Sequence, residues 1–181
     1  MDRYLEAAAG ASESEFADRC PHPVLILAVS GSEEQEPLHT FKTISISRAA
    51  LASATGAAEV VGGKYRALVI QKQGGNEWED WITLGRAPNN DLVLHDASVS
   101  KLHALLRVQD GATSIQDAGS RNGTRVGARK LAERAPVVLT PGEGVLIGTV
   151  QTVFHDPTSF FRFLCALTDG DASEFVGALG G

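Results

Sequence analysis

Short apolar runs separated by polar, turn-forming residues dominate the chain from residue 64 to residue 155. Runs of this length with Gly, Asp, Asn and Pro between them are typical of an all-β sandwich. The glycine-rich stretch 73–76 predicts a hairpin between the first two strands. The strands are expected at residues 65–71, 78–84, 91–94, 102–108, 113–116, 125–126, 136–139, 144–147 and 150–155.

The first 63 residues carry no motif that we can tie to chemistry. Residues 3–19 are rich in alanine and glutamate and predict one or two short helices, interrupted near Gly10. A continuous apolar run at 24–29 and an alternating one at 43–47 each predict a strand. We therefore expect a mixed helix and strand extension that packs on the sandwich.

The end of the chain predicts a helix. Asp156 and Pro157 form an N-cap and a first-turn proline, and Gly170 supplies the stop. The apolar residues between them fall on one helical face, which is expected to cover the sandwich. The chain thus divides into an extension (1–63), a sandwich (64–155) and a C-terminal helix with a tail (156–181).

Composition narrows the class of protein. The 181 residues suit one main domain, and the longest apolar run, 23–29, is far shorter than the roughly 20 residues of a membrane-spanning helix. The N-terminus lacks the apolar centre of a secretion signal, so we expect a cytoplasmic protein without membrane contact. Cys20 and Cys165 stand far apart, which predicts free thiols, no metal site and no cofactor.

Charge is distributed unevenly along the chain. Residues 84–134 contain eight basic and five acidic residues, a balance of +3, whereas the whole chain carries −6 and the remainder therefore −9. An acidic protein is a poor nucleic-acid binder, because most of its surface repels a polyanion. A locally basic segment suits a small anionic ligand, although solvated surface charges would give the same count.

Four short motifs lie within residues 84–124. They are Gly85-Arg86, Ser100-Lys101-Leu102-His103, Asp117, and Ser120-Arg121-Asn122-Gly123-Thr124. Each is common alone, but their order and spacing, with Asn-Asp after the arginine, resemble the forkhead-associated (FHA) domain. The resemblance runs from about Lys64 to His155. One departure is Gly127-Ala128, where the family often has Asn-Gly, in a turn away from the phosphate.

The resemblance implies an FHA-type β-sandwich of two antiparallel sheets whose loops bind phosphothreonine peptides without catalysis. It implies that Arg86 and Ser100 hold the phosphate and that Asn122 bonds the peptide backbone. Two neighbours that often touch the ligand are Lys101 and Arg121, while Ser98 lies in the loop that helps to choose the residue three after the phosphothreonine. The residues expected to support the site are Gly85, His103, Gly123 and Thr124.

The chemistry of these residues agrees with that assignment. Phosphothreonine is nearly a dianion at neutral pH, and a planar guanidinium can meet two of its oxygens at once. The Ser100 hydroxyl and the Asn122 amide would add direction without adding charge. A surface salt bridge to Asp91 or Asp96 is the alternative role for Arg86.

The sequence fits a hydrolase or a nucleotide-binding protein less well than a phosphopeptide-binding one. Ser100, His103 and Asp117 form a nominal hydrolase triad, but residues three apart on an extended segment point to opposite faces and no G-x-S-x-G elbow is present. The 119–124 turn lacks the Gly-Lys-Ser/Thr ending of a nucleotide-binding P-loop. We therefore expect that this protein is not an enzyme. The remaining rival is a scaffold or oligomerisation module with an unused phosphate site.

The expected partner is a threonine-phosphorylated protein or peptide in serine/threonine kinase signalling, with the kinase itself as a second candidate. Thr168 is followed by an acid three residues later, a spacing that some FHA ligands have. Phosphorylated Thr168 is thus a candidate ligand within the chain, although the polar end of a helix is the simpler interpretation.

Overall fold

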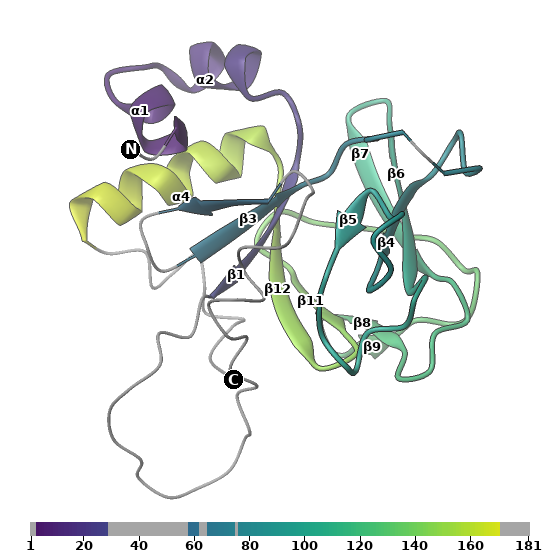
Figure 1. The fold of residues 1–181 in the computed structure, drawn as a ribbon. Coiled ribbons are helices and arrows are strands. Elements are labelled where there is room, and N and C mark those ends of the chain that lie inside the picture. Colours follow the sequence, from purple (N-terminus) through teal and green to yellow (C-terminus); the bar gives the residue numbers. More distant parts are fainter. Residues whose placement is uncertain (1–2, 29–57, 62–64, 75, 171–181) are drawn as a thin grey trace, which may run out of the picture.

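The computed structural model describes residues 3–28, 58–61, 65–74 and 76–170, and its strands form two sheets (Figure 1). The seven-stranded sheet has the order β2-β3-β1-β12-β11-β8-β9 and is antiparallel throughout. Its strands are β1 (Val24–Ala28), β2 (Ala58–Val61), β3 (Tyr65–Val69), β8 (Thr124–Val126), β9 (Arg129–Lys130), β11 (Gly144–Ile147) and β12 (Val150–His155).

The five-stranded sheet has the order β10-β7-β6-β4-β5. Its strands are antiparallel except for the parallel pair β4 and β5. The predicted all-β sandwich is thus confirmed with one parallel pair. The strands are β4 (Ile82–Gly85), β5 (Leu92–Val93), β6 (Ala104–Gln109), β7 (Ala112–Asp117) and β10 (Val137–Val138).

The predicted hairpin around residues 73–76 is wrong. Strand β3 pairs with β1 and β2, whereas β4 pairs with β5 and β6, so the two predicted arms belong to different sheets. The connection between them crosses from one sheet to the other and is held by side-chain hydrogen bonds rather than by a tight turn. The strand expected at 43–47 lies outside the described residues.

Two hydrophobic cores explain the continuous apolar run at residues 24–29. In β1, Leu25 and Leu27 point between the two sheets, while Val24 and Ile26 point into a second core beneath the helices. A strand buried on both faces reads as an unbroken apolar run. The predicted extension therefore supplies an inner strand of the sandwich, and the division of the chain at residue 63 remains a prediction.

The C-terminal helix lies on the outer face of β1 and β3, on the side away from the five-stranded sheet, and two shorter helices of the described part pack against it (Figure 1). They are α1 (Arg3–Ala8), α2 (Glu13–Arg19) and α4 (Pro157–Asp169). Asp156 caps α4 through its carboxylate and Gly170 ends it in the left-handed conformation, as expected. Phe160 and Phe163 are fully buried, so the apolar stripe of α4 packs on the protein's own core. No helix in the described part is long and apolar enough to cross a membrane.

Candidate functional site

Arg86 leaves the end of β4 and lies against the segment that contains Ser100. Its backbone N–H donates to the Ser100 carbonyl at 2.8 Å, and its Nε donates to the Val99 carbonyl at 3.2 Å. The side chain is exposed. Among the described residues no carboxylate lies within salt-bridge distance of the Arg86 guanidinium. Asp91, one of the two carboxylates expected there, is paired with Lys72 instead. The guanidinium of this exposed side chain is thus held through Nε, and no hydrogen bond from its two terminal nitrogens to another described residue is seen.

Gly85 allows this close approach. A Cβ atom at residue 85 would overlap the Lys101 carbonyl oxygen, a contact that the backbone would have to relieve. The segment on which Ser100 lies can therefore sit against β4 only because residue 85 has no side chain.

Replacing Gly85 by alanine is expected to lower the free energy of unfolding by about 2 kcal/mol, because the new methyl group overlaps backbone rather than a flexible side chain. Urea unfolding measures this loss. The control is Gly111→Ala, where the added methyl meets open space and only the positive φ of 76° matters, at a cost of about 1 kcal/mol. Equal losses in the two variants would contradict the close approach.

His103 lies fully buried beneath the two loops that carry Ser100 and Asn122. Its Nδ1 accepts from the Ser100 backbone N–H at 3.0 Å, and its Nε2 lies 3.1 Å from the Gly123 carbonyl, an arrangement that fits the tautomer with the proton on Nε2. Burial lowers the pKa of the imidazole, against the opposing effects of the Gly123 carbonyl and Asp117. Both ring nitrogens are engaged with backbone, so His103 has the contacts of a residue that ties the loops together.

The hydrolase triad does not assemble. His103 receives the amide of Ser100 and not its hydroxyl, and the hydroxyl oxygen instead accepts from the Arg121 N–H at 3.0 Å. The Asp117 carboxylate accepts hydrogen bonds from its own turn. Neither His103 nor Asp117 is therefore placed to act as a general base for the Ser100 hydroxyl, which can donate its proton in a hydrogen bond to an anion.

Asp117 organises the turn that carries Asn122. Its carboxylate accepts from the Gly119 and Ser120 amides at 2.9 and 2.8 Å and from the Ser120 and Thr124 hydroxyls at 2.7 Å each. Burial raises the pKa of this carboxyl, but the hydrogen bonds outweigh it and the pKa falls below its usual value. Gly123 has a φ of 82°, a conformation that glycine adopts without strain.

Asn122 is exposed beside Ser98. Its Nδ2 donates to the Ser98 carbonyl at 2.6 Å, which leaves its Oδ1 directed away from that bond. The Ser98 hydroxyl donates to Asp96 at 2.5 Å and accepts from the Thr149 amide at 3.0 Å. These bonds join the Asn122 turn, the Ser98 segment and the β11–β12 turn into one end of the sandwich. The exposed cations Lys101 and Arg121 flank it.

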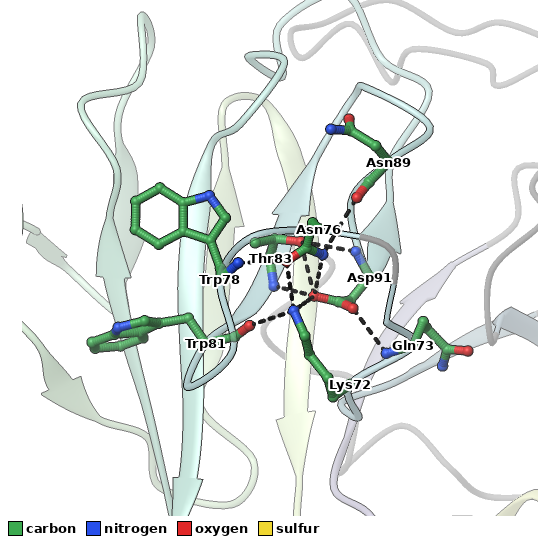
Figure 2. Close-up of polar contacts among 8 residues, drawn as sticks. All are labelled: Lys72, Gln73, Asn76, Trp78, Trp81, Thr83, Asn89 and Asp91. Carbon is green, nitrogen blue, oxygen red and sulfur yellow. Dashed lines mark hydrogen bonds and ion pairs between the residues drawn. The ribbon is translucent and has the colours of Figure 1, made fainter.

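The Asp91 carboxylate, a candidate salt-bridge partner of Arg86 from the sequence, is instead buried at the centre of a separate hydrogen-bond cluster (Figure 2). Asp91 accepts from the amides of Gln73 and Thr83 at 2.8 Å each, and from the Thr83 hydroxyl at 2.9 Å. Lys72 Nζ and Asn76 Nδ2 each lie 3.1 Å from it. The cluster joins Lys72, Gln73 and Asn76 to β4 and to the end of loop 86–91. The position of Asp91 directly before the apolar residues Leu92 and Val93 is the sequence feature that could have predicted a buried carboxylate here.

The hydrogen bonds set the titration of Asp91. Burial alone raises the pKa of its carboxyl, but the Thr83 and Gln73 amides, Asn76 and Lys72 outweigh that effect and lower the pKa from 3.8 to about 2. Asp91 is therefore ionised throughout the physiological range.

Acid is expected to weaken the fold through Asp91. A folded-state pKa below the unfolded one contributes stability that is present above the unfolded pKa and disappears as pH falls through the folded pKa. The window is pH 4 to 2, and the loss is about 2 kcal/mol. Urea unfolding at a series of pH values measures it, and Asp91→Asn should remove that part of the slope. An unchanged slope in Asp91→Asn would contradict this assignment.

The predicted ligand residues meet at one end of the sandwich. Arg86 is bonded to Val99, the neighbour of Ser100. Ser100 in turn is bonded to Arg121, the neighbour of Asn122, and Asn122 is bonded to Ser98. The described part of the chain contains no group of three or more His, Cys, Asp or Glu side chains placed to hold a metal ion. The arrangement offers an oriented guanidinium, a hydroxyl and an amide, which suits recognition of an anion and not bond cleavage.

Comparison with known proteins identifies similar chains. The family model described as "FHA domain" matches residues 82–148. The oxoglutarate dehydrogenase inhibitor of Corynebacterium efficiens is 35% identical over 108 residues, which cover 56% of this chain and 72% of that protein. The glycogen accumulation regulator GarA of Mycolicibacterium smegmatis is 33% identical over 144 residues, or 68% of this chain and 87% of that one.

Among solved structures, the second FHA domain of a Mycobacterium tuberculosis ABC transporter is similar to this chain. It is 33% identical, with a TM-score of 0.38, and the match covers 49% of this chain and 78% of that one.

Proposed function

Because this chain belongs to the forkhead-associated family, we propose that it binds threonine-phosphorylated proteins and so mediates phosphorylation-dependent interactions in serine/threonine kinase signalling. The observation that carries the proposal is the guanidinium of Arg86, which has no ion-pair partner among the described residues and is bound to the segment that carries the Ser100 hydroxyl. The relatives are named an inhibitor and a regulator, and the family consists of binding domains, so the chain acts by binding rather than by catalysis. We place it in the cytoplasm, where such kinases act.

Each site residue has a proposed part. Arg86 would form two charge-assisted hydrogen bonds to phosphate oxygens, and Ser100 would add a third from its hydroxyl. Asn122 would accept from a peptide N–H through Oδ1, because its Nδ2 is bound to Ser98. Lys101 and Arg121 would strengthen the local positive potential, and Ser98 would help to select a downstream residue.

The supporting residues keep the proposed binding groups at fixed positions relative to one another. Gly85 permits the contact with the Ser100 segment, His103 links that segment to Gly123, and Thr124 bonds to Asp117. A site assembled on loops that are pinned to a rigid sandwich binds without a large ordering cost. This supports a site that is already formed before the peptide arrives.

Binding of a phosphothreonine peptide is expected to weaken as pH falls below about 6, where the phosphate takes up its second proton. Burial holds the pKa of His103 below its ordinary value, which moves protonation of this imidazole to lower pH than in an ordinary histidine. His103→Asn is the control that separates its contribution from that of the phosphate. Titration calorimetry between pH 5 and 7.5 measures the effect. A flat profile over that range would count against recognition of the dianion.

An oriented phosphopeptide library, screened in parallel against the wild type and Arg86→Ala, tests the proposal. We expect the wild type to enrich phosphothreonine peptides and the variant to enrich none. Equal recovery of phosphorylated and unphosphorylated peptides by the wild type would favour a scaffold whose phosphate site is unused. Enrichment that survives in Arg86→Ala would move the phosphate site elsewhere.

A further inference from the structure

A groove with a volume of about 520 Å³ lies beside the Arg86 loop. Its walls come from the segment before β4, from loop 86–91 and from the residues that follow Ser100. The Trp78 side chain, which is 44% exposed, gives the groove an accessible aromatic surface. The lining residues also include Glu77, Ala87, Asn89 and Lys101.

Hydrogen bonds to the buried Asp91 cluster hold the Trp78 backbone in place. The Trp78 N–H donates to Asn76 Oδ1 at 3.1 Å. Asn76 Nδ2 in turn lies 3.1 Å from the Asp91 carboxylate and 3.2 Å from the Thr83 hydroxyl. The indole ring points away from these bonds (Figure 2). Trp78 is therefore anchored through its backbone, while its ring projects from the anchored segment.

The Trp78 ring and the Glu77 carboxylate have no cationic partner among the described residues. Trp81, three positions after Trp78, has one, because the Arg107 guanidinium carbon lies 5.8 Å from the centre of its ring. In the described part of the chain no cation lies over the Trp78 ring in this way, and none is within salt-bridge distance of Glu77. An aromatic face and a carboxylate both attract a cation.

The groove continues the surface on which the candidate phosphate site lies. The Ser100 segment lies between the Asn122 turn and the Arg86 loop, because it is bonded to both. The Arg86 loop is bonded in turn to Asn76, whose amide donates to a carbonyl of the loop at 3.4 Å. A peptide that crosses from Asn122 over Arg86 therefore reaches Trp78 next.

We propose that this groove binds an arginine side chain of the threonine-phosphorylated partner, on the side of the phosphothreonine opposite to Asn122. The proposal rests on the phosphopeptide binding proposed above. The guanidinium stacks on the Trp78 ring and forms a salt bridge with Glu77. Lys101 also lines the groove, and its charge is offset by the phosphate bound beside it. The arginine therefore adds affinity when the threonine is phosphorylated.

Calorimetric titration of the full chain with matched phosphothreonine peptides tests this proposal. An arginine is placed at one position at a time, about two to four residues before or after the phosphothreonine in an extended peptide. Glutamine takes its place in the reference peptide, and glutamate reverses its charge. We expect arginine to raise the affinity about fivefold on one side of the phosphothreonine only, and glutamate to lower it there.

Variants of the groove assign this gain to its residues. Trp78→Ala and Glu77→Gln should each remove most of the gain that arginine gives over glutamine. Glu79→Gln is the matched control, because Glu79 is an exposed carboxylate two positions further on that does not line the groove. This variant should retain the gain.

Trp78 fluorescence provides a second measurement. The chain contains two tryptophans, so Trp81→Phe leaves Trp78 as the single emitting indole. The arginine phosphopeptide at saturation should protect this indole from quenching by acrylamide, because the guanidinium covers the exposed ring. The glutamine phosphopeptide should protect it less. Equal quenching with the two peptides would overturn the proposal.

Failure of the groove differs from failure of the proposed function. If the glutamine peptide binds equally well with and without its phosphate, the proposed function fails, and the arginine groove fails with it. If binding depends on the phosphate but arginine gives no gain at any position, or the gain survives in Trp78→Ala, the groove alone is overturned. Preference for glutamate would assign the groove to an acidic side chain bound by Lys101 and would also overturn the proposal.

Discussion

Replacing Arg86 by alanine is expected to weaken binding of a phosphothreonine peptide by about 1.5–3 kcal/mol, or roughly tenfold to 150-fold. The loss is large because the guanidinium would supply two charged hydrogen bonds to the phosphate. The bond from Nε to the Val99 carbonyl holds the Arg86 guanidinium in place, and no other described cation has this bond that could take over its role. Titration calorimetry with one peptide and several variants measures it.

Two controls separate this role from simple charge. Arg86→Lys keeps the positive charge but loses the planar pair of donors, so we expect an affinity between those of the wild type and the alanine variant. Arg129→Ala removes an exposed arginine from the same basic stretch and should change the affinity only slightly. Wild-type affinity in Arg86→Ala would contradict the assignment of the phosphate to this residue.

Asp91→Asn is expected to lower the free energy of unfolding by about 3 kcal/mol. The amide has nearly the shape of the carboxylate, so the loss reports charge and acceptors rather than volume. One oxygen acceptor becomes a donor facing the Thr83 or Gln73 amide, and Lys72 loses its buried counter-ion. Urea unfolding of the two proteins measures the difference.

Asp110→Asn is the matched control for this variant. Asp110 is exposed in the turn between β6 and β7 with a φ of 51°, a conformation that asparagine also tolerates. Its replacement should cost no more than about 0.5 kcal/mol. If Asp91→Asn cost as little as the control, the buried cluster would not be what holds the crossing segment in place.

Local patterns in the sequence were sufficient to predict the positions of the described helices and of most strands. Asp156, Pro157 and Gly170 fixed the ends of α4 because capping depends on neighbouring residues. The unbroken apolar run at 24–29 correctly predicted a strand, and the structure shows that β1 is buried on both faces. The order of the motifs from Gly85 to Thr124 likewise predicted that Arg86, Ser100 and Asn122 lie at one end of the sandwich, where hydrogen bonds connect the segments that carry them.

The errors arose where structure depends on contacts between distant residues. The glycine-rich stretch 73–76 looks like a hairpin turn, but the Asp91 carboxylate, 18 positions after Gln73, draws the segment across to the other sheet. No local pattern reports such a bond. The ion pair between Lys72 and Asp91 has the same origin, since these residues lie 19 positions apart in the chain.

The central claim is that this chain recognises the phosphate of a phosphothreonine peptide. Calorimetric titration of the wild type with one peptide, prepared with threonine either phosphorylated or unmodified, tests it most directly. We expect saturable binding of the phosphorylated peptide and no measurable heat from the unmodified one. Equal affinity for the two peptides would contradict the claim.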